Sequence, residues 1–135
     1  MSRTLARETA TKLLYQLTFQ DDCNWNDTLE NTLGKDSLTD ADIMYIDDVM
    51  TNINKHLDTI DGEITNVSHR WRIDRMSKVD LSILRLAVYE IRYREDIPNS
   101  VSINEAVEIA KKYGSEESSA FINGLLSSIV NGENE

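Results

Sequence analysis

The sequence predicts an all-α protein of roughly seven helices without strands. Apolar residues recur at helical spacing along nearly the whole chain. Five Gly and one Pro are too few for the closely spaced turns of an all-β sandwich or barrel. The 135 residues, 40% hydrophobic and 28% charged, are typical of one globular domain and exclude global disorder.

The first predicted helix runs from about Arg3 to Phe19. Its apolar side chains share one face: Ala6, Ala10, Leu13, Leu14 and Leu17. Arg3, Arg7 and Thr11 follow at steps of four on another face, with Tyr15 near its edge. This second face would present arginines and an aromatic ring together.

A short helix is expected around residues 27–33, ending at Gly34. Residues 37–40 offer capping side chains for the next helix. The most regular apolar pattern of the chain then follows: Ile43, Ile46, Met50, Ile53, Leu57, Ile60, Ile64 and Val67. We expect this stripe to pack in the core, with a break near residues 56–59 that divides it into two helices. A coiled coil is the alternative.

The next helix begins with the capping residue Ser77 and stops before Ile97–Pro98, because the residue before proline disfavours the α conformation. Its apolar stripe is Leu81, Leu84, Val88 and Ile91. Its other flank carries Lys78, Ser82, Arg85, Tyr89 and Arg92. Two interpretations of this flank stay open, RNA contact or internal packing with Arg85 in an ion pair.

Residues 102–105 have the pattern of a capping box that opens another helix, ending at Tyr113–Gly114. Ser115 or Ser118 would cap the last helix. That helix is expected to pack through Phe121, Ile122, Leu125, Leu126 and Ile129.

Charge is unevenly distributed along the chain. The net charge of −10 argues against non-specific nucleic-acid binding. Residues 21–66 carry most of the acidity, whereas residues 1–20 and 67–98 are each basic overall. Arginines beside aromatic rings suit single-stranded RNA, since guanidinium groups meet phosphates and rings stack on unpaired bases. Pairing of these arginines with nearby carboxylates is the alternative.

The residues point to a binding protein rather than an enzyme. The single cysteine, Cys23, excludes an internal disulfide and a cysteine-based zinc site. We find no nucleophile elbow, no phosphate loop and no calcium loop, and expect neither a catalytic residue nor a metal or other cofactor. We also find no signal peptide and no apolar run of 18 residues, so we expect a cytoplasmic protein without membrane contact.

Five longer segments and the Ile97–Pro98 pair resemble the NusB family of transcription antitermination factors, in order and with the family's spacing. The longer segments are Leu5–Tyr15, Trp71–Met76, Val79–Glu90, Ser102–Gly114 and Phe121–Leu126. The resemblance implies a single domain over residues 1–135. It also implies two packed helical subdomains, at about 1–75 and 76–135.

The resemblance further implies a non-catalytic scaffold. Such a protein joins NusE, the small-subunit ribosomal protein also called S-ten, and binds the boxA RNA signal. The assembly helps RNA polymerase to pass terminators, notably in ribosomal RNA operons. Homodimers occur in some members of the family, and the sequence does not decide between monomer and homodimer.

Carried over by position, the RNA-binding residues implied by the resemblance are Arg3, Arg7, Tyr15, Glu117, Ser118 and Phe121, and Asp80 is the residue directed toward NusE. Thr4 and Leu5 stand where some members carry arginine. Fewer phosphate contacts mean lower affinity, so we expect weak RNA binding that NusE strengthens.

Two alternatives remain from the sequence. The smaller number of arginines in the first helix and the net charge of −10 favour a protein-interaction module that has lost RNA binding. A helical accessory domain of an RNA-modifying system is the other, because a related module occurs fused to RNA methyltransferases. The role of the acidic segment 21–66 stays open.

Overall fold

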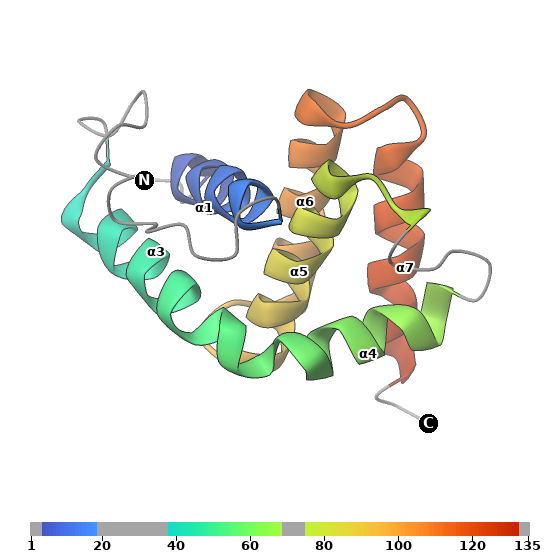
Figure 1. The fold of residues 1–135 in the computed structure, drawn as a ribbon, viewed down its shortest axis with the longest axis horizontal. Coiled ribbons are helices and arrows are strands. Elements are labelled where there is room, and N and C mark those ends of the chain that lie inside the picture. Colours follow the sequence, from blue (N-terminus) through green and yellow to red (C-terminus); the bar gives the residue numbers. More distant parts are fainter. Residues whose placement is uncertain (1–3, 19–37, 69–74, 133–135) are drawn as a thin grey trace.

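The computed structural model describes residues 4–18, 38–68 and 75–132, which form helices joined by short turns, without strands. The elements are α1 (Thr4–Leu17), α3 (Asp40–Asn52), the 3-10 helix η2 (Ile53–His56), α4 (Leu57–Ser68), α5 (Lys78–Tyr93), α6 (Asn99–Tyr113) and α7 (Ser118–Gly132) (Figure 1). The predicted all-α class is confirmed. The helix expected at residues 27–33 and its glycine lie outside the described residues.

Two helices begin at the predicted capping residues. The hydroxyl of Thr39 accepts a hydrogen bond from the backbone N–H of Asp42 at 3.1 Å, and the Asp42 carboxylate accepts one from the N–H of Thr39 at 3.0 Å. The Ser77 hydroxyl accepts from the N–H of Asp80 at 3.0 Å, opening α5. A side-chain cap of this kind typically stabilises a helix by about 1 kcal/mol.

The capping box predicted at residues 102–105 is wrong. Helix α6 begins at Asn99, and the carbonyl of Pro98 already accepts the backbone N–H of Ser102 at 3.2 Å. Proline directly before a helix needs no hydrogen bond for its nitrogen, so it can precede the first turn. The Ser102 and Glu105 side chains are therefore free to contact other helices.

The long apolar stripe divides as expected, with the break slightly earlier than predicted. The 3-10 helix η2 separates α3 from α4 at residues 53–56. Ile46, Met50, Ile53, Ile60 and Ile64 are buried, and Ile43, Leu57 and Val67 are half-buried. The stripe packs in this chain's own core, as predicted.

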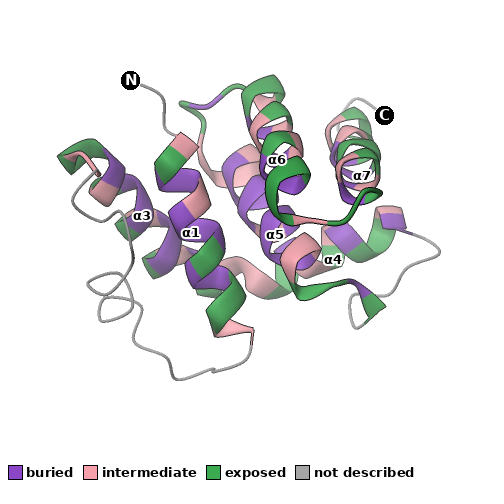
Figure 2. Ribbon diagram, turned by 90° about the horizontal axis from the view of Figure 1, so that it is seen from above, coloured by how far each residue is buried: buried purple, intermediate pink, exposed green. Residues whose placement is uncertain are grey.

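Helix α5 lies at the centre of the fold and contacts α1, α4, α6 and α7. Buried residues follow it along most of its length, from Leu81 to Glu90 (Figure 2). Helix α1 also contacts α3 and α6, and α4 also contacts α7. The division into subdomains near residue 75 stays a prediction.

Helix α7 closes the core through Ile122, Leu125, Leu126 and Ile129. Phe121 is only half-buried and packs against the edge of this core. Its ring therefore keeps part of its surface toward solvent, which distinguishes it from the other residues predicted to pack on α7.

Candidate nucleic-acid interface

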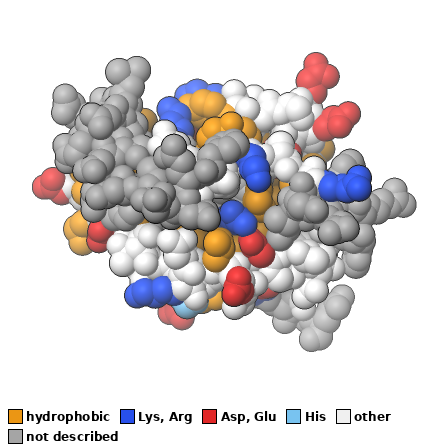
Figure 3. All heavy atoms as spheres, in the orientation of Figure 1, with side chains coloured by type: hydrophobic (Ala, Val, Ile, Leu, Met, Phe, Trp, Pro, Cys, Tyr) orange, Lys and Arg blue, Asp and Glu red, His pale blue; other side chains and the backbone are white. Residues whose placement is uncertain are grey.

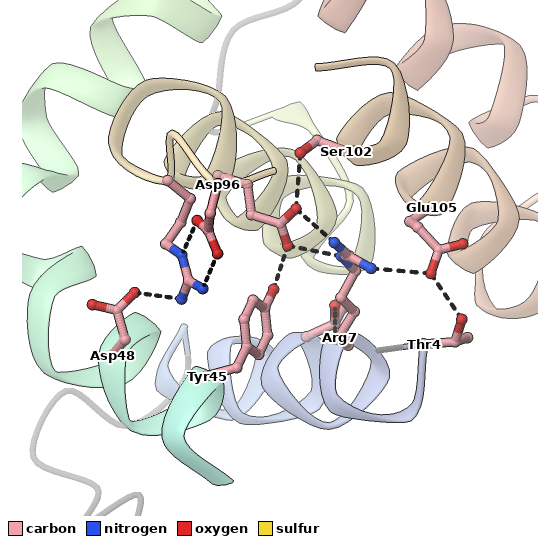
Figure 4. Close-up of polar contacts among 10 residues, drawn as sticks. Thr4, Arg7, Tyr45, Asp48, Asp96, Ser102 and Glu105 are labelled. Atoms are coloured by element: carbon pink, nitrogen blue, oxygen red, sulfur yellow. Dashed lines mark hydrogen bonds and ion pairs between the residues drawn. The ribbon is translucent and has the colours of Figure 1, made fainter. Parts of the chain in front are cut away.

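Arg7, a predicted RNA residue, points into the protein and is 5% exposed. Its guanidinium donates to both carboxylate oxygens of Glu90, at 2.9 and 3.2 Å, and to Glu105 at 3.2 Å (Figure 4). Burial alone would lower the pKa of Arg7, but the hydrogen bond and charge of Glu90 outweigh it and raise the pKa. Arg7 thus joins α1 to α5 and α6, and its role toward RNA stays a prediction.

The same carboxylate gathers further donors. Glu90 also accepts hydrogen bonds from the Tyr45 hydroxyl and, at 2.8 Å, from the Ser102 hydroxyl. Burial, together with the charge of Glu90, raises the pKa of Tyr45 well above its usual range, so this phenol stays protonated. Four helices, α1, α3, α5 and α6, meet at this one buried carboxylate.

The face of α1 that remains outside differs from the predicted one. Arg7 and Thr11 are buried, and the Thr11 hydroxyl donates to the Arg7 carbonyl at 2.8 Å. The outward stripe is instead Leu5, Glu8, Lys12 and Tyr15, all exposed except the half-buried Glu8. Lys12 is not among the predicted site residues, although it lies four residues after Glu8 on the helix face that also carries Tyr15.

Two arginines of the basic flank of α5 form ion pairs with α4. Arg85 donates to both oxygens of Asp61 at 2.9 and 2.8 Å, and Arg92 donates to Glu63. Tyr89 is buried and its hydroxyl donates to Asp48 at 3.1 Å. Of the two interpretations of this flank, internal packing is therefore the one that the structure supports.

Four predicted site residues meet at one pocket of about 270 Å³. Residues 75–80, at the start of α5, contribute one wall and residues 115–121, at the start of α7, the other; the lining is Arg75, Met76, Ser77, Asp80, Ser115, Glu117, Ser118 and Phe121. Gly114 lets the end of α6 pack closely against Ser118 beside the pocket. A Cβ atom on residue 114 would lie only 2.6 Å from the Ser118 Cβ. Arg3 lies outside the described residues.

The predicted residues differ in what they offer to a ligand. Glu117 is exposed, whereas Ser118 is buried and its hydroxyl accepts the backbone N–H of Ser115 at 2.9 Å. The Oδ1 atom of Asp80 is buried and has no hydrogen-bond partner among the described residues. A buried acceptor left unpaired costs about 1–3 kcal/mol, so a donor from a bound molecule would stabilise this site. The half-buried ring of Phe121 adds an apolar surface on which a base could stack.

Within the described ranges, no three His, Cys, Asp or Glu side chains stand close enough to hold a metal ion together. None of the helices in these ranges combines the length and apolar character that crossing a membrane requires.

Known proteins resemble this chain over nearly its full length. The NusB family model matches residues 4–131. The transcription antitermination protein NusB of Acetivibrio thermocellus is 49% identical, over 96% of this chain and 89% of its own. That of Ruminiclostridium cellulolyticum is 46% identical, over 98% and 91%.

Solved structures share the fold. NusB of T. maritima superposes with a TM-score of 0.87 at 35% identity, covering 97% of this chain and 92% of its own. A crystal structure of the antitermination factors NusB and NusE in complex with double-stranded RNA matches with a TM-score of 0.81 at 25% identity, covering 98% and 99%. The full-length family match, the close relatives and the common fold together establish that this chain belongs to the NusB family.

Proposed function

We propose that this protein is a non-catalytic transcription antitermination factor that binds boxA RNA together with NusE. Its relatives in Acetivibrio thermocellus and Ruminiclostridium cellulolyticum are named transcription antitermination proteins. A structure that contains NusB, NusE and RNA aligns with 98% of this chain. The protein would act in the cytoplasm, as part of the RNA polymerase complex that transcribes ribosomal RNA operons.

The observation that carries this proposal is the pocket between the starts of α5 and α7. It brings Asp80, the residue expected to face NusE, together with Glu117, Ser118 and Phe121, which are expected to face RNA. Two ligands held at adjoining sites raise each other's effective concentration, so weak separate affinities combine into a stable assembly. No bond needs to be made or broken by this chain.

RNA binding by the protein alone should be weak. Arg7 is withdrawn into an ion pair with Glu90, and Thr4 donates its hydroxyl hydrogen to Glu105 at 2.8 Å. Each phosphate contact that is missing lowers both the affinity and its dependence on salt. NusE would add its own contacts to the same RNA.

The test is fluorescence anisotropy of a labelled boxA RNA, with and without NusE, at two salt concentrations. We expect RNA binding to tighten when NusE is present. Phe121→Leu should weaken RNA binding by the pair and leave NusE binding unchanged, because it removes only the ring surface. Asp80→Asn should weaken NusE binding measured without RNA.

A second candidate is a protein-interaction module without RNA binding. The burial of Arg7 and the net charge of −10 favour it. It would be established if NusE binds and the assembled pair shows no affinity for boxA RNA at either salt concentration. Formation of a homodimer, measured by light scattering, would be a separate property that bears on whether the RNA face is accessible.

A further inference from the structure

The end of α6 lies against the outward face of α1, where four side chains form a polar seam. Glu8 accepts hydrogen bonds from the Lys112 ammonium at 3.0 Å and from the Tyr113 hydroxyl at 2.7 Å. The Nζ atoms of Lys12 and Lys112 lie 5.5 and 5.3 Å from the centre of the Tyr113 ring. We call Glu8, Lys12, Lys112 and Tyr113 the α1–α6 seam.

The seam holds two ammonium groups near one aromatic ring at the surface. Lys12, Lys112 and Tyr113 are exposed, while the Glu8 side chain is only 12% exposed. Burial would raise the pKa of Glu8, but hydrogen bonds from Tyr113 and Lys112 lower it overall, so its carboxylate is charged at neutral pH. The ring attracts both ammonium groups through its negative face and limits their separation.

The seam can give its positive charge to a ligand more readily than the arginines that lie at the joints between helices. Arg7, Arg85, Arg92 and Arg94 each bind carboxylates at the joints between elements. The Lys112 ammonium is instead in solvent, where an ion pair is weak, and Lys12 has no ion pair with any other residue in the described ranges. A phosphate could therefore share both ammonium groups without disrupting a buried contact.

The position of the seam favours RNA as the ligand. Tyr15 follows Lys12 by one turn on the outward stripe of α1, and Tyr113 is followed within eight residues by Glu117 and Phe121 at the pocket. The seam thus belongs to both chain segments on which RNA contacts are expected. On the face shown in Figure 3, basic side chains are interspersed with hydrophobic and acidic ones rather than gathered into one field. On such a surface, a phosphate would bind at a local pair of lysines rather than to an extended basic patch.

We infer that the α1–α6 seam binds a backbone phosphate of single-stranded RNA. Lys12 and Lys112 donate to the phosphate oxygens, and Glu8 and Tyr113 position the two ammonium groups. The inference rests on the proposed RNA-binding function and extends it to residues outside the predicted set.

The test compares two double variants of the protein in complex with NusE, titrated with boxA RNA over a series of salt concentrations. Lys12→Gln with Lys112→Gln removes both ammonium groups of the seam. Lys55→Gln with Lys111→Gln is the matched control, because it changes the net charge equally at two exposed lysines outside the seam. Each lost phosphate contact on a single strand reduces the slope of log affinity against log salt by about 0.7.

We expect the seam variant to bind several-fold more weakly and to lose about 0.7 from the salt slope, because the seam contacts one phosphate. The control variant should keep the slope. Tyr113→Phe should bind nearly as wild type, since it keeps the ring, whereas Tyr113→Leu should weaken binding as it releases both lysines. Circular dichroism of each variant confirms that the helices are intact.

Failures of the two proposals are distinguishable. If the wild-type pair binds RNA and the seam variant has the same affinity and slope, the seam inference alone is overturned. If the seam variant loses affinity for NusE in the absence of RNA and keeps the RNA salt slope, the seam is a protein contact and the inference is wrong. If the wild-type pair binds no RNA, both the proposed function and this inference fall.

Discussion

At the scale of single residues, the Arg7–Glu90 pair shows how a residue's neighbours decide its role. Glu90 is 1% exposed and accepts hydrogen bonds from Arg7, Tyr45 and Ser102. Removing one partner of such a pair leaves an uncompensated buried charge, which typically costs 3–5 kcal/mol, whereas replacing both partners with apolar groups can cost little.

We therefore expect Arg7→Met to lower the free energy of unfolding by about 3 kcal/mol or more. Glu90→Leu alone should also destabilise, and the double variant should lose clearly less than the sum of the two. Urea denaturation followed by circular dichroism measures all three. A loss below about 1 kcal/mol for Arg7→Met, or simple additivity, would show that the pair is not coupled in solution.

Arg7 also shows the limit of sequence analysis at this scale. Its spacing from Arg3 and Tyr15 was consistent with an RNA-binding face, and nothing local contradicted that prediction. Its main acceptor lies 83 residues away on α5, and a buried acceptor at such a distance leaves no signal in the helix itself. Only packing of α1 against α5 determines that the guanidinium turns inward.

At the scale of elements, prediction succeeded where the cause is local. The stripe from Ile43 to Val67 and the caps at Thr39 and Ser77 depend on neighbouring residues only, and the structure has them. The box at residues 102–105 failed because its serine and glutamate have the right spacing but bind Glu90, Thr4 and Arg7 on other helices. The same residue types serve as caps or as interhelical contacts, and tertiary packing decides between them.

The contact between α5 and α3 gives a pH-dependent prediction. Burial and, to a smaller extent, the charge of Asp48 raise the pKa of Tyr89 from an ordinary value of 10.0 to about 12. Between these values the unfolded chain releases this proton and the folded chain keeps it, so the contribution of Tyr89 to stability is complete below pH 10 and falls as the pH rises toward 12.

Tyr89→Phe removes this titration. We expect the stability advantage of wild type over Tyr89→Phe to shrink steadily from pH 10 to pH 12. Chemical denaturation at a series of alkaline pH values measures the difference, and Tyr45, whose pKa burial also raises, is present in both proteins. A difference that stays constant over this range would mean that Tyr89 is not held against Asp48.

At the scale of the whole molecule, the pocket illustrates what the sequence alone cannot assemble. Its two walls, residues 75–80 and 115–121, are about forty residues apart in the chain. Periodicity places each segment at the start of a helix but does not bring the two starts together. The family resemblance singled out Asp80, Glu117, Ser118 and Phe121, whereas Arg75 and Met76 join them only through the packing of α5 beside α7.

The central position of α5 leads to a prediction for the entire fold. Although two subdomains are predicted, α5 buries side chains against α1 on one side and against α4, α6 and α7 on the others. Loss of either set of contacts would expose the apolar surface of this one helix, so neither group of helices should unfold alone.

We therefore expect one cooperative thermal transition, with a ratio of calorimetric to van't Hoff enthalpy of about 1. Hydrogen exchange should give the amides of α5 the highest protection, equal to that of the best protected amides in α1 and α7. Differential scanning calorimetry and exchange measured by NMR test this together. Two resolved transitions would instead establish that the subdomains are independently stable. The same conclusion would follow if α1 exchanged its amides by local opening while those of α7 stayed fully protected. In either case the hydrogen bonds of Glu90 with Arg7, Tyr45 and Ser102 would not couple the two groups of helices.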